Sequence, residues 1–346
     1  MSKYINIWDY IDRLYPFQIF IGGRGTGKTY SALSGALKLS DKFIYMRRTA
    51  QELDIMLDSE KYGEGANPFK PINRDFNKNI GLSRIVKNLA GIYNREEVDG
   101  TIKCCGAPIG YGVALSTIST IRSVDLSDCS DCIYDEFIPE RHVKKIKNEG
   151  GALLNAYETI CRNRELSGQD PLRLWLLANS NDIYNQIFVE LGLVAKIEKM
   201  IRRNKTDKYI KDRGLAIHLI NNNEEFISEK RETALYKLTR GSQFSEMALD
   251  NKFSYNDFSL IRHENITGFR PICSFGKGFI YGKKGDSYLY VTYAAARCPA
   301  YYDIDTEQGR RNFYADIGRR IHEYFISSRI AFESYELKQI ILDLIL

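Results

Sequence analysis

The chain has 346 residues, 44% of them apolar, and a formal net charge of +5 at pH 7. This length is enough for one large globular domain or two ordinary ones, and no apolar stretch is long enough to cross a membrane as a helix. The composition therefore excludes a membrane-spanning protein, and because the N-terminal residues lack the pattern of a secretion signal, we expect a cytoplasmic protein.

The first motif, GGRGTGKT at residues 22–29, matches the P-loop pattern G-x-x-x-x-G-K-[ST]. It follows an apolar run typical of a buried strand, Phe17–Ile21, and precedes a helical pattern, Thr29–Leu39, which is the order a phosphate-binding loop requires. In such a loop the glycines let backbone N–H groups surround a phosphate, the lysine reaches the β and γ oxygens, and the threonine binds Mg²⁺. We therefore expect ATP and Mg²⁺ to be bound by Gly22, Gly23, Arg24, Gly25, Thr26, Gly27, Lys28 and Thr29.

Short apolar strands alternate with helical patterns along the first half of the chain, which predicts an α/β fold with a mostly parallel central sheet. The strands are Phe17–Ile21, Lys42–Met46, Cys132–Tyr134 and Leu172–Ala178. Between about Gly81 and Ser116, short alternating pieces separated by glycines predict antiparallel additions to that sheet. A helix is expected over about Gly151–Asn163, and its sheet-facing residues would be Leu153, Leu154, Tyr157, Ile160 and Cys161.

An acidic motif, CIYDEF, follows roughly a hundred residues after the glycine loop. Because Cys132–Tyr134 is an expected strand, Asp135 and Glu136 would lie at its carboxyl end, beside the loop. There Asp135 would complete the magnesium shell with Thr29, and Glu136 would act as the general base that activates water. An acidic turn at a strand end is the alternative.

Four further residues are candidates for catalysis. Asn179 ends the last of these strands, where its amide could sense the γ-phosphate, although an ordinary turn after a strand explains it equally well. Arg162 and Arg164 close the expected helix and are candidates for an arginine finger, with complementation of the helix dipole as the alternative. Arg24, inside the loop, is the other finger candidate.

The composition changes after Leu193. Residues 196–213 hold eight basic residues against three acidic ones, a surplus equal to the net charge of the whole chain, which indicates a domain junction. A charged helical stretch at Glu224–Thr239 follows. Beyond it, strand-like runs and two amphipathic helical patterns from about Arg310 onward predict a smaller α+β unit. The strand-like runs are Phe269–Phe275, Gly278–Gly282 and Tyr288–Tyr293.

In their order and spacing, several motifs resemble those of the genome-packaging ATPases of small protein-primed podoviruses, relatives of the large terminases. These motifs are IGGRGTGKTY, FIYMRR, YDEF, ICRNRE, LLANS, SEKRETALYKL and EMALDNKF. The loop and the acidic motif are generic to P-loop ATPases, whereas FIYMRR, RNRE and LDNKF are more specific. The resemblance covers, in pieces, about Phe17–Phe253.

The resemblance implies an ATP-driven motor subunit that moves double-stranded DNA into an empty procapsid, within a homo-oligomeric ring on the portal vertex that is a pentamer in this family. It implies a P-loop ATPase domain (residues 1–200), a basic helical linker domain (201–245) and a degenerate RNase H-like domain that binds nucleic acid or the portal (246–346). Nuclease activity is not expected, because Asp286, Asp303 and Asp305 make no convincing set of strand-end carboxylates. The expected location is the host cytoplasm and, transiently, the procapsid portal; whether a packaging RNA takes part is left open.

A motor that moves along any sequence should hold DNA through its phosphates. We expect those contacts from cations of the basic run, namely Arg202, Arg203, Lys205 and Lys208, with a solvated linker face as the alternative. Two other functions are compatible with the motifs. One is a helicase or recombination-type ATPase acting on single strands, and the other is a nucleotide-gated scaffold without hydrolysis, against which Glu136 argues.

Overall fold

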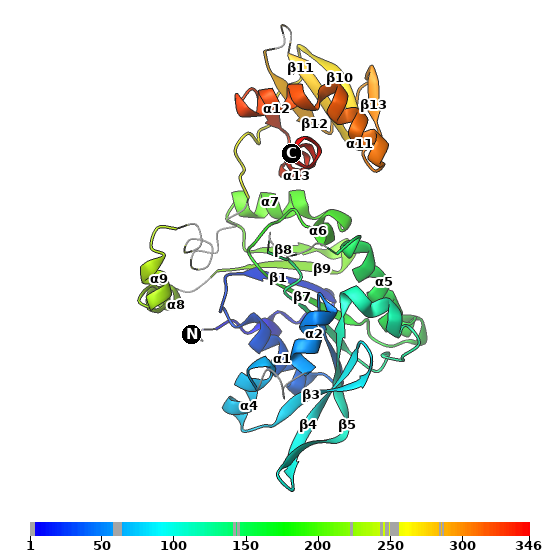
Figure 1. Ribbon diagram of the computed structural model, residues 1–346, viewed down its shortest axis with the longest axis vertical. Helices are drawn as coiled ribbons and strands as arrows, with labels where there is room; N and C mark the ends of the chain where they lie inside the picture. The colour runs from blue at the N-terminus through cyan, green and yellow to red at the C-terminus, as the bar shows by residue number, and fades with distance from the viewer. Residues whose placement is uncertain are drawn as a thin grey trace. The chain divides into compact units, whose positions relative to one another are not determined.

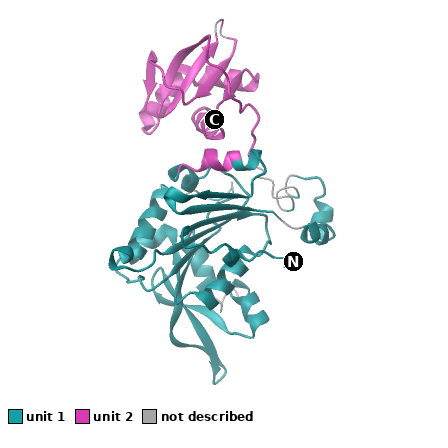
Figure 2. Ribbon diagram, turned by 180° about the vertical axis from the view of Figure 1, so that it is seen from behind, with its two compact units in different colours: residues 1–191, 200–255 teal, residues 192–199, 256–346 magenta. Residues whose placement is uncertain are grey.

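The structure, a computed structural model, describes residues 4–57, 64–140, 143, 146–221, 224–242, 245, 249, 256–283, 285 and 287–346. The chain divides into two compact units, one of residues 1–191 and 200–255 and one of residues 192–199 and 256–346 (Figure 2). By its contacts, the stretch 201–245 groups with the first unit. The linker domain expected at residues 201–245 therefore stays a prediction.

Among the described residues, the first unit contains a nine-stranded sheet in the order β3-β4-β5-β2-β6-β7-β1-β9-β8 (Figure 1). The strands are β1 (Phe17–Gly22), β2 (Phe43–Arg47), β3 (Ile80–Val86), β4 (Leu89–Val98), β5 (Thr101–Ala114), β6 (Asp131–Asp135), β7 (Arg173–Asn179), β8 (Asp207–Ile210) and β9 (Leu215–Ile220). From β5 to β9 along this order the neighbours are parallel, whereas β3, β4 and β8 add antiparallel pairs at the two edges. The expected parallel core with antiparallel additions is confirmed.

Helices cover both faces of this sheet. The helices of the unit are α1 (Lys28–Leu39), α2 (Ala50–Leu57), α4 (Lys70–Phe76), α5 (Glu149–Cys161), α6 (Gln186–Glu190), α7 (Val194–Arg202, shared with the second unit), α8 (Glu224–Arg231) and α9 (Ala234–Leu238). Short 3-10 helices lie at Ile7–Tyr10, Glu64–Ala66, Leu115–Ile121, Arg164–Ser167 and Lys211–Arg213. Because strand side chains alternate, Ile133 of β6 packs in the core with α1, whereas the next residue, Tyr134, bonds to Glu149 of α5 on the other face.

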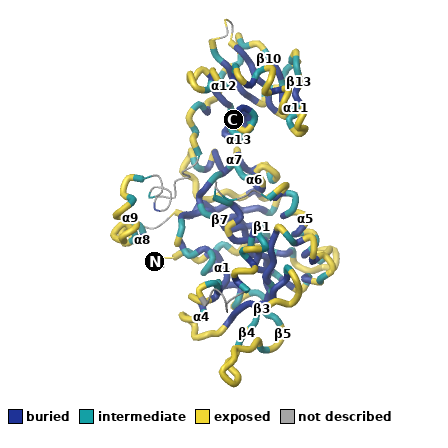
Figure 3. Tube along the Cα trace, viewed as in Figure 1, coloured by how far each residue is buried: buried dark blue, intermediate teal, exposed yellow. Residues whose placement is uncertain are grey.

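Two sequence expectations about this unit are corrected. Leu154, expected to face the sheet, is 45% exposed, whereas Leu153 and Ile160 on the same helix are buried. In Figure 3 the central strands β1 and β7 are buried over most of their length. Strands β8 and β9 were not expected, because the charged run 196–213, which contains β8 and ends just before β9, was interpreted as a domain junction. Yet Leu215–Ile220 is apolar except for His218, pairs in parallel with β1 and is buried along its whole length.

The second unit contains a five-stranded sheet in the order β13-β10-β11-β12-β14 among its described residues. Its elements are β10 (Phe269–Phe275), β11 (Gly278–Lys283), β12 (Leu289–Thr292), β13 (Ala300–Tyr302), α11 (Glu307–Phe313), a π-helical turn (Tyr314–Gly318), α12 (Arg319–Ile326), β14 (Ile330–Phe332) and α13 (Tyr335–Ile345). The meander β10–β12 is antiparallel, and β13 and β14 extend it in parallel at opposite edges. The three expected strands and the smaller α+β unit are confirmed, and β13 and β14 were missed.

The acidic residues considered for a nuclease site do not form a metal site in the described part of the chain. Asp303 and Asp305 are exposed, and Asp286 lies outside the described residues. No group of three acidic, histidine or cysteine side chains in the described part could hold a metal ion. The motif LDNKF also lies outside them except for Leu249. No described helix combines the length and apolarity needed to cross a bilayer.

Candidate nucleotide site

The glycine loop connects the end of β1 to the start of α1. Gly25 and Gly27 have φ values of 78° and 89°, in the left-handed region that favours glycine. Lys28 is buried, and its Nζ donates hydrogen bonds to the carbonyl oxygens of Gly22 (3.0 Å) and Gly23 (2.9 Å). Burial lowers the pKa of Lys28 to about 8, against the opposing effect of Asp135 and Glu136. The loop thus holds its lysine inward, where phosphate oxygens would be.

A cavity of about 500 Å³ opens beside this loop, which is large enough for the phosphates of a nucleotide. Its walls combine residues of the loop, from Arg24 to Thr29, with the end of β6 and the end of β7. The lining residues from outside the loop include Asp135, Glu136, Glu140 and Asn179. Residues expected at the site from separate parts of the sequence are therefore brought to one cavity.

Asp135 is the most constrained acid in the cavity. Its Oδ2 accepts hydrogen bonds from Thr29 Oγ1 and from Tyr45 Oη, each at 2.9 Å. Burial raises the pKa of Asp135, although Arg47 opposes this effect. A hydroxyl and a carboxylate side by side are the hard oxygen donors that Mg²⁺ prefers, so Thr29 and Asp135 fit the expected metal ion.

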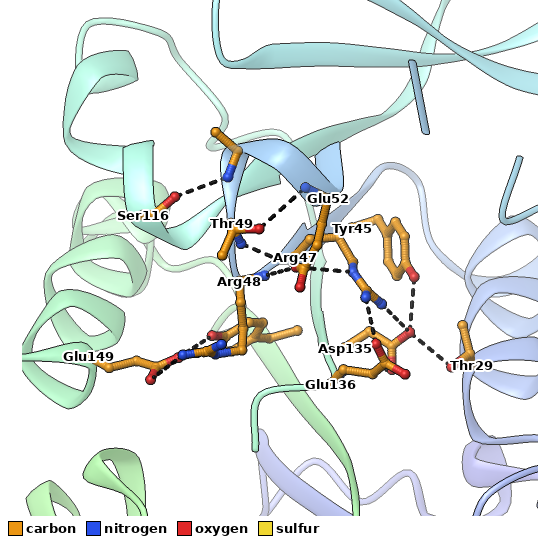
Figure 4. Close-up of polar contacts among 12 residues, drawn as sticks. Thr29, Tyr45, Arg47, Arg48, Thr49, Glu52, Ser116, Asp135, Glu136 and Glu149 are labelled. Atoms are coloured by element: carbon orange, nitrogen blue, oxygen red, sulfur yellow. Dashed lines mark hydrogen bonds and ion pairs between the residues drawn. The ribbon is translucent and has the colours of Figure 1, made fainter. Parts of the chain in front are cut away.

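Arg47 joins the two acids of the motif (Figure 4). Its Nη1 lies 3.3 Å from Asp135 Oδ2, and its Nη2 lies 2.6 Å from Glu136 Oε2. The Glu136 side chain is 55% exposed, and its backbone φ of 54° is uncommon for a residue other than glycine. Arg47 therefore orients a carboxylate that packing leaves free to move.

Asn179 owes its position to the strand order. Because β7 lies between β1 and β6, the carboxyl end of β7 falls between the loop and the acidic pair. The Asn179 Oδ1 atom accepts a long hydrogen bond of 3.5 Å from Lys28 Nζ. Its side chain is thus within reach of the phosphate end of a bound nucleotide.

The arginine candidates fall into two places. Arg24 lines the cavity and pairs with Glu140, and its Nε makes no hydrogen bond within the described residues. Arg162 Nη2 donates to the carbonyl of Val124 (2.9 Å), and Arg164 donates to the carbonyl of Cys129. Both carbonyls precede β6, so these two arginines lie at the amino edge of the sheet, away from the cavity of their own subunit.

A second buried ion pair begins one residue after Arg47. Arg48 is 2% exposed, and its Nε and Nη2 bond to Glu149 at 2.7 and 3.0 Å. Tyr134 donates to the same carboxylate at 3.0 Å. Glu149 begins α5, the helix whose far end leads to Arg162. The end of β2 is therefore tied both to the acidic pair and to α5.

The four cations expected to contact DNA are all exposed and close together in the sequence. Arg202 ends α7, Arg203 and Lys205 lie in the following turn, and Lys208 lies on β8. Because β8 is an edge strand of the sheet, an exposed lysine there also discourages pairing with other chains, which is a structural alternative to DNA binding.

Comparison with known proteins decides the family. The model of the family described as Podovirus DNA encapsidation protein (Gp16) matches residues 2–294. The chain belongs to this family. Two curated relatives are the DNA packaging protein of Bacillus phage phi29, 30% identical over 247 residues (70% of this chain and 63% of the relative), and that of Bacillus phage B103, 32% identical over 249 residues (70% and 65%). The match thus spans less than two thirds of the length of these relatives.

The fold of the Podovirus encapsidation family is also seen in two solved structures. The bacteriophage Phi-29 viral genome packaging motor assembly contains a chain with a TM-score of 0.64 at 21% identity, over 99% of this chain and 98% of that one. The Phi-28 gp11 DNA packaging motor gives a TM-score of 0.56 at 18% identity, over 96% and 94%. At these identities the likeness establishes a shared fold.

The sequence patterns missed several residues of the site. Tyr45, Arg47 and Arg48 stand in FIYMRR, which the resemblance to encapsidation proteins included without giving any of them a role. Their signal was available, because Arg47 and Arg48 directly follow the expected strand Lys42–Met46, and functional sites form at the carboxyl edge of parallel strands. Glu149 carried no such signal, since its ion pair joins it to Arg48, 101 positions earlier in the chain.

Proposed function

We propose that this protein is the ATPase subunit of a viral packaging motor that moves double-stranded DNA into an empty procapsid. The observation that carries the proposal is the Thr29–Asp135 hydrogen bond at the cavity, with Glu136 beside it, in a member of the Podovirus encapsidation family. Curated relatives named DNA packaging proteins support the same function.

In this proposal the residues of the cavity have separate tasks. The loop amides and Lys28 bind the β- and γ-phosphates of ATP, and Thr29 and Asp135 hold Mg²⁺, which neutralises the charge that develops on the phosphates. Glu136 accepts a proton from the attacking water, and Asn179 orients that water or the γ-phosphate. Arg47 pairs with Oε2 of Glu136, so Oε1 can accept that proton while the guanidinium keeps the carboxylate oriented.

The position of Arg162 and Arg164 favours a role in a neighbouring subunit. They lie at the amino edge of the sheet, whereas the cavity lies at the carboxyl edge, so neither side chain can reach the cavity of its own chain. A head-to-tail ring places two different surfaces of the subunit against each other, so an arginine finger could be supplied across that interface. A homo-oligomeric ring, with five subunits as the family implies, is part of the proposal.

The proposed partners follow from the same role. Exposed Arg202, Arg203, Lys205 and Lys208 would bind DNA phosphates without reading the sequence, and residues 246–346 would bind nucleic acid or the portal as a degenerate domain without nuclease activity. The motor would form in the host cytoplasm and act transiently at the portal of the procapsid. A packaging RNA is a further partner that the same assembly could accept.

ATP hydrolysis measured with different nucleic acids tests this function. We expect duplex DNA to stimulate hydrolysis, and purified empty procapsids to take up DNA only when ATP and the wild-type protein are present. The Glu136→Gln variant is the matched control, since it should bind ATP without packaging. Stimulation by single-stranded but not duplex DNA would instead support the helicase function, and an absence of hydrolysis under every condition would support the scaffold.

A further inference from the structure

Lys230 of α8 contacts the glycine loop from a position 206 residues further along the chain. Its Nζ donates a hydrogen bond to the backbone carbonyl of Arg24, inside the loop. A Cβ atom added to the next residue, Gly25, would meet the same Nζ at 3.1 Å, so the ammonium lies directly against the Arg24–Gly25 peptide. Gly25 itself lines the cavity.

The hydrogen bond to the Arg24 carbonyl fixes the direction of the Gly25 N–H, which belongs to the same peptide group. In a trans peptide the C=O of one residue and the N–H of the next point in opposite directions, and the described chain contains no cis bonds. A cation fixed on the Arg24 carbonyl therefore turns the Gly25 N–H away from α8. It also polarises the amide, which makes that N–H a stronger donor.

The ammonium of Lys230 is held in place by two aromatic rings as well as by the loop carbonyl. It lies 4.8 Å from the ring centre of Phe226 and 5.3 Å from that of Tyr236, both of which are buried. Burial lowers the pKa of Lys230, and the nearby Arg24 lowers it further. A lysine fixed by two rings against a loop carbonyl loses less freedom on binding than an exposed lysine does.

We propose that Lys230 is a positioning residue for the nucleotide: through the Arg24 carbonyl it holds the Gly25 N–H toward the phosphates and couples α8 and α9 to the state of the loop. The inference rests on the proposed function, because it needs the loop to bind ATP. A purely structural tie between α8 and the loop is the alternative, and that role would change stability without changing nucleotide affinity selectively.

Nucleotide binding by three variants tests the proposal. Lys230→Met keeps the apolar stem but removes the donor, and Lys230→Arg restores a donor. Lys237→Met is the matched control, since Lys237 is an exposed lysine of α9 that pairs with Glu232 instead of the loop. The dissociation constant of MgADP is measured for each by titration with a fluorescent analogue, and thermal unfolding is measured without nucleotide.

We expect Lys230→Met to weaken MgADP binding about tenfold. This is the usual contribution of one hydrogen bond to a charged group, here the bond from the Gly25 N–H to a phosphate. Lys230→Arg should recover affinity to within about threefold of the wild type, and Lys237→Met should bind like the wild type. Affinity of Lys230→Met within twofold of the wild type, or an equal loss in Lys237→Met, would overturn the inference while leaving the proposed function intact. A wild-type protein that failed to bind MgADP would overturn both.

Discussion

Arg47 and Glu136 form a direct ion pair, with 2.6 Å between Nη2 and Oε2. The same guanidinium contacts Asp135, which precedes Glu136 and is buried at the end of β6. One planar fork thus holds the expected metal ligand and the expected general base at once. A lysine ammonium could not reproduce this arrangement, because it lacks a second nitrogen held in a fixed plane.

Arg47→Lys should therefore separate catalysis from binding. We expect the KM for MgATP to stay within about threefold of the wild type and kcat to fall by about 10- to 100-fold, because Glu136 would no longer be held in one orientation. Steady-state kinetics measure both constants. Arg84→Lys, at an exposed pair with Asp54, is the control and should change neither constant. A rise in KM without a fall in kcat would contradict this role.

Lys28→Ala and Glu136→Gln should fail at different steps. Lys28→Ala removes the buried cation of the phosphate cradle and should abolish tight ATP binding, whereas Glu136→Gln should keep binding and lower turnover by at least about 10²-fold. Equilibrium binding and single-turnover hydrolysis distinguish the two. Hydrolysis by Glu136→Gln at close to the wild-type rate would mean that another group is the general base.

Mixed rings should reveal the arginine finger. Arg162→Ala or Arg164→Ala alone should be nearly inactive if that residue acts on the neighbouring subunit. Mixing it with Glu136→Gln should restore part of the ATPase activity, because an intact site beside a Glu136→Gln subunit receives an intact arginine. A mixture of Lys28→Ala and Glu136→Gln is the control, since both changes act within one subunit. If no mixing ratio restored activity, a role within the same subunit would be favoured and Arg24 would become the better candidate.

Neutralising the basic cluster should weaken binding to all duplexes alike. With Arg202, Arg203, Lys205 and Lys208 replaced by glutamine, the slope of log affinity against log salt should shrink by up to about one for each DNA phosphate that the protein no longer neutralises, and basal ATPase activity should persist. Fluorescence anisotropy at several salt concentrations measures the slope. Four exposed lysines elsewhere serve as the control set: Lys70, Lys78, Lys87 and Lys103. An unchanged slope would leave the run as a solvated face.

Acid should loosen the second unit through Asp257. Burial alone would raise the pKa of Asp257, but hydrogen bonds from the buried Lys338 and from Ser259 lower it to about 2. Because folding lowers the pKa, the stabilisation is complete above about pH 5 and is lost progressively as the pH falls to 2 and below. Asp257→Asn should cost about 1 kcal/mol at neutral pH, since the carboxylate is largely exposed.

Hydrogen exchange of the α13 amides in the full chain measures the difference in unfolding free energy between Asp257→Asn and the wild type. This difference should be the same at pH 7 and pH 5 and shrink as the pH falls from 5 toward 2, because the wild-type protein then loses the stabilisation that the charged carboxylate provides. Asp305→Asn, at an exposed acid of the same unit, should show no such pattern. A difference between Asp257→Asn and the wild type that stayed constant down to pH 2.5 would show that the hydrogen bonds, not the charge, carry the effect.

Local patterns in the sequence predicted most of the central sheet and the position of the loop, because β1, β2, β6 and β7 are short apolar runs bounded by polar residues. They failed at β9, where a neighbouring excess of charge suggested a boundary although the strand itself is apolar. The partners of Arg47, Arg48 and Lys230 could not be predicted either. Those contacts depend on strand order and on segments tens to hundreds of residues apart, which no local periodicity encodes.

Arg47 and Arg48 leave the end of β2 on opposite faces of the sheet, one toward Asp135 and the other toward Glu149 (Figure 4). A single inserted residue would move each arginine to the other face, so both ion pairs would be lost together although no side chain had been changed. The β4–β5 hairpin, whose tip is exposed, faces no such restriction. Relatives are therefore expected to vary in length at that hairpin and to keep a constant length between Tyr45 and Arg48.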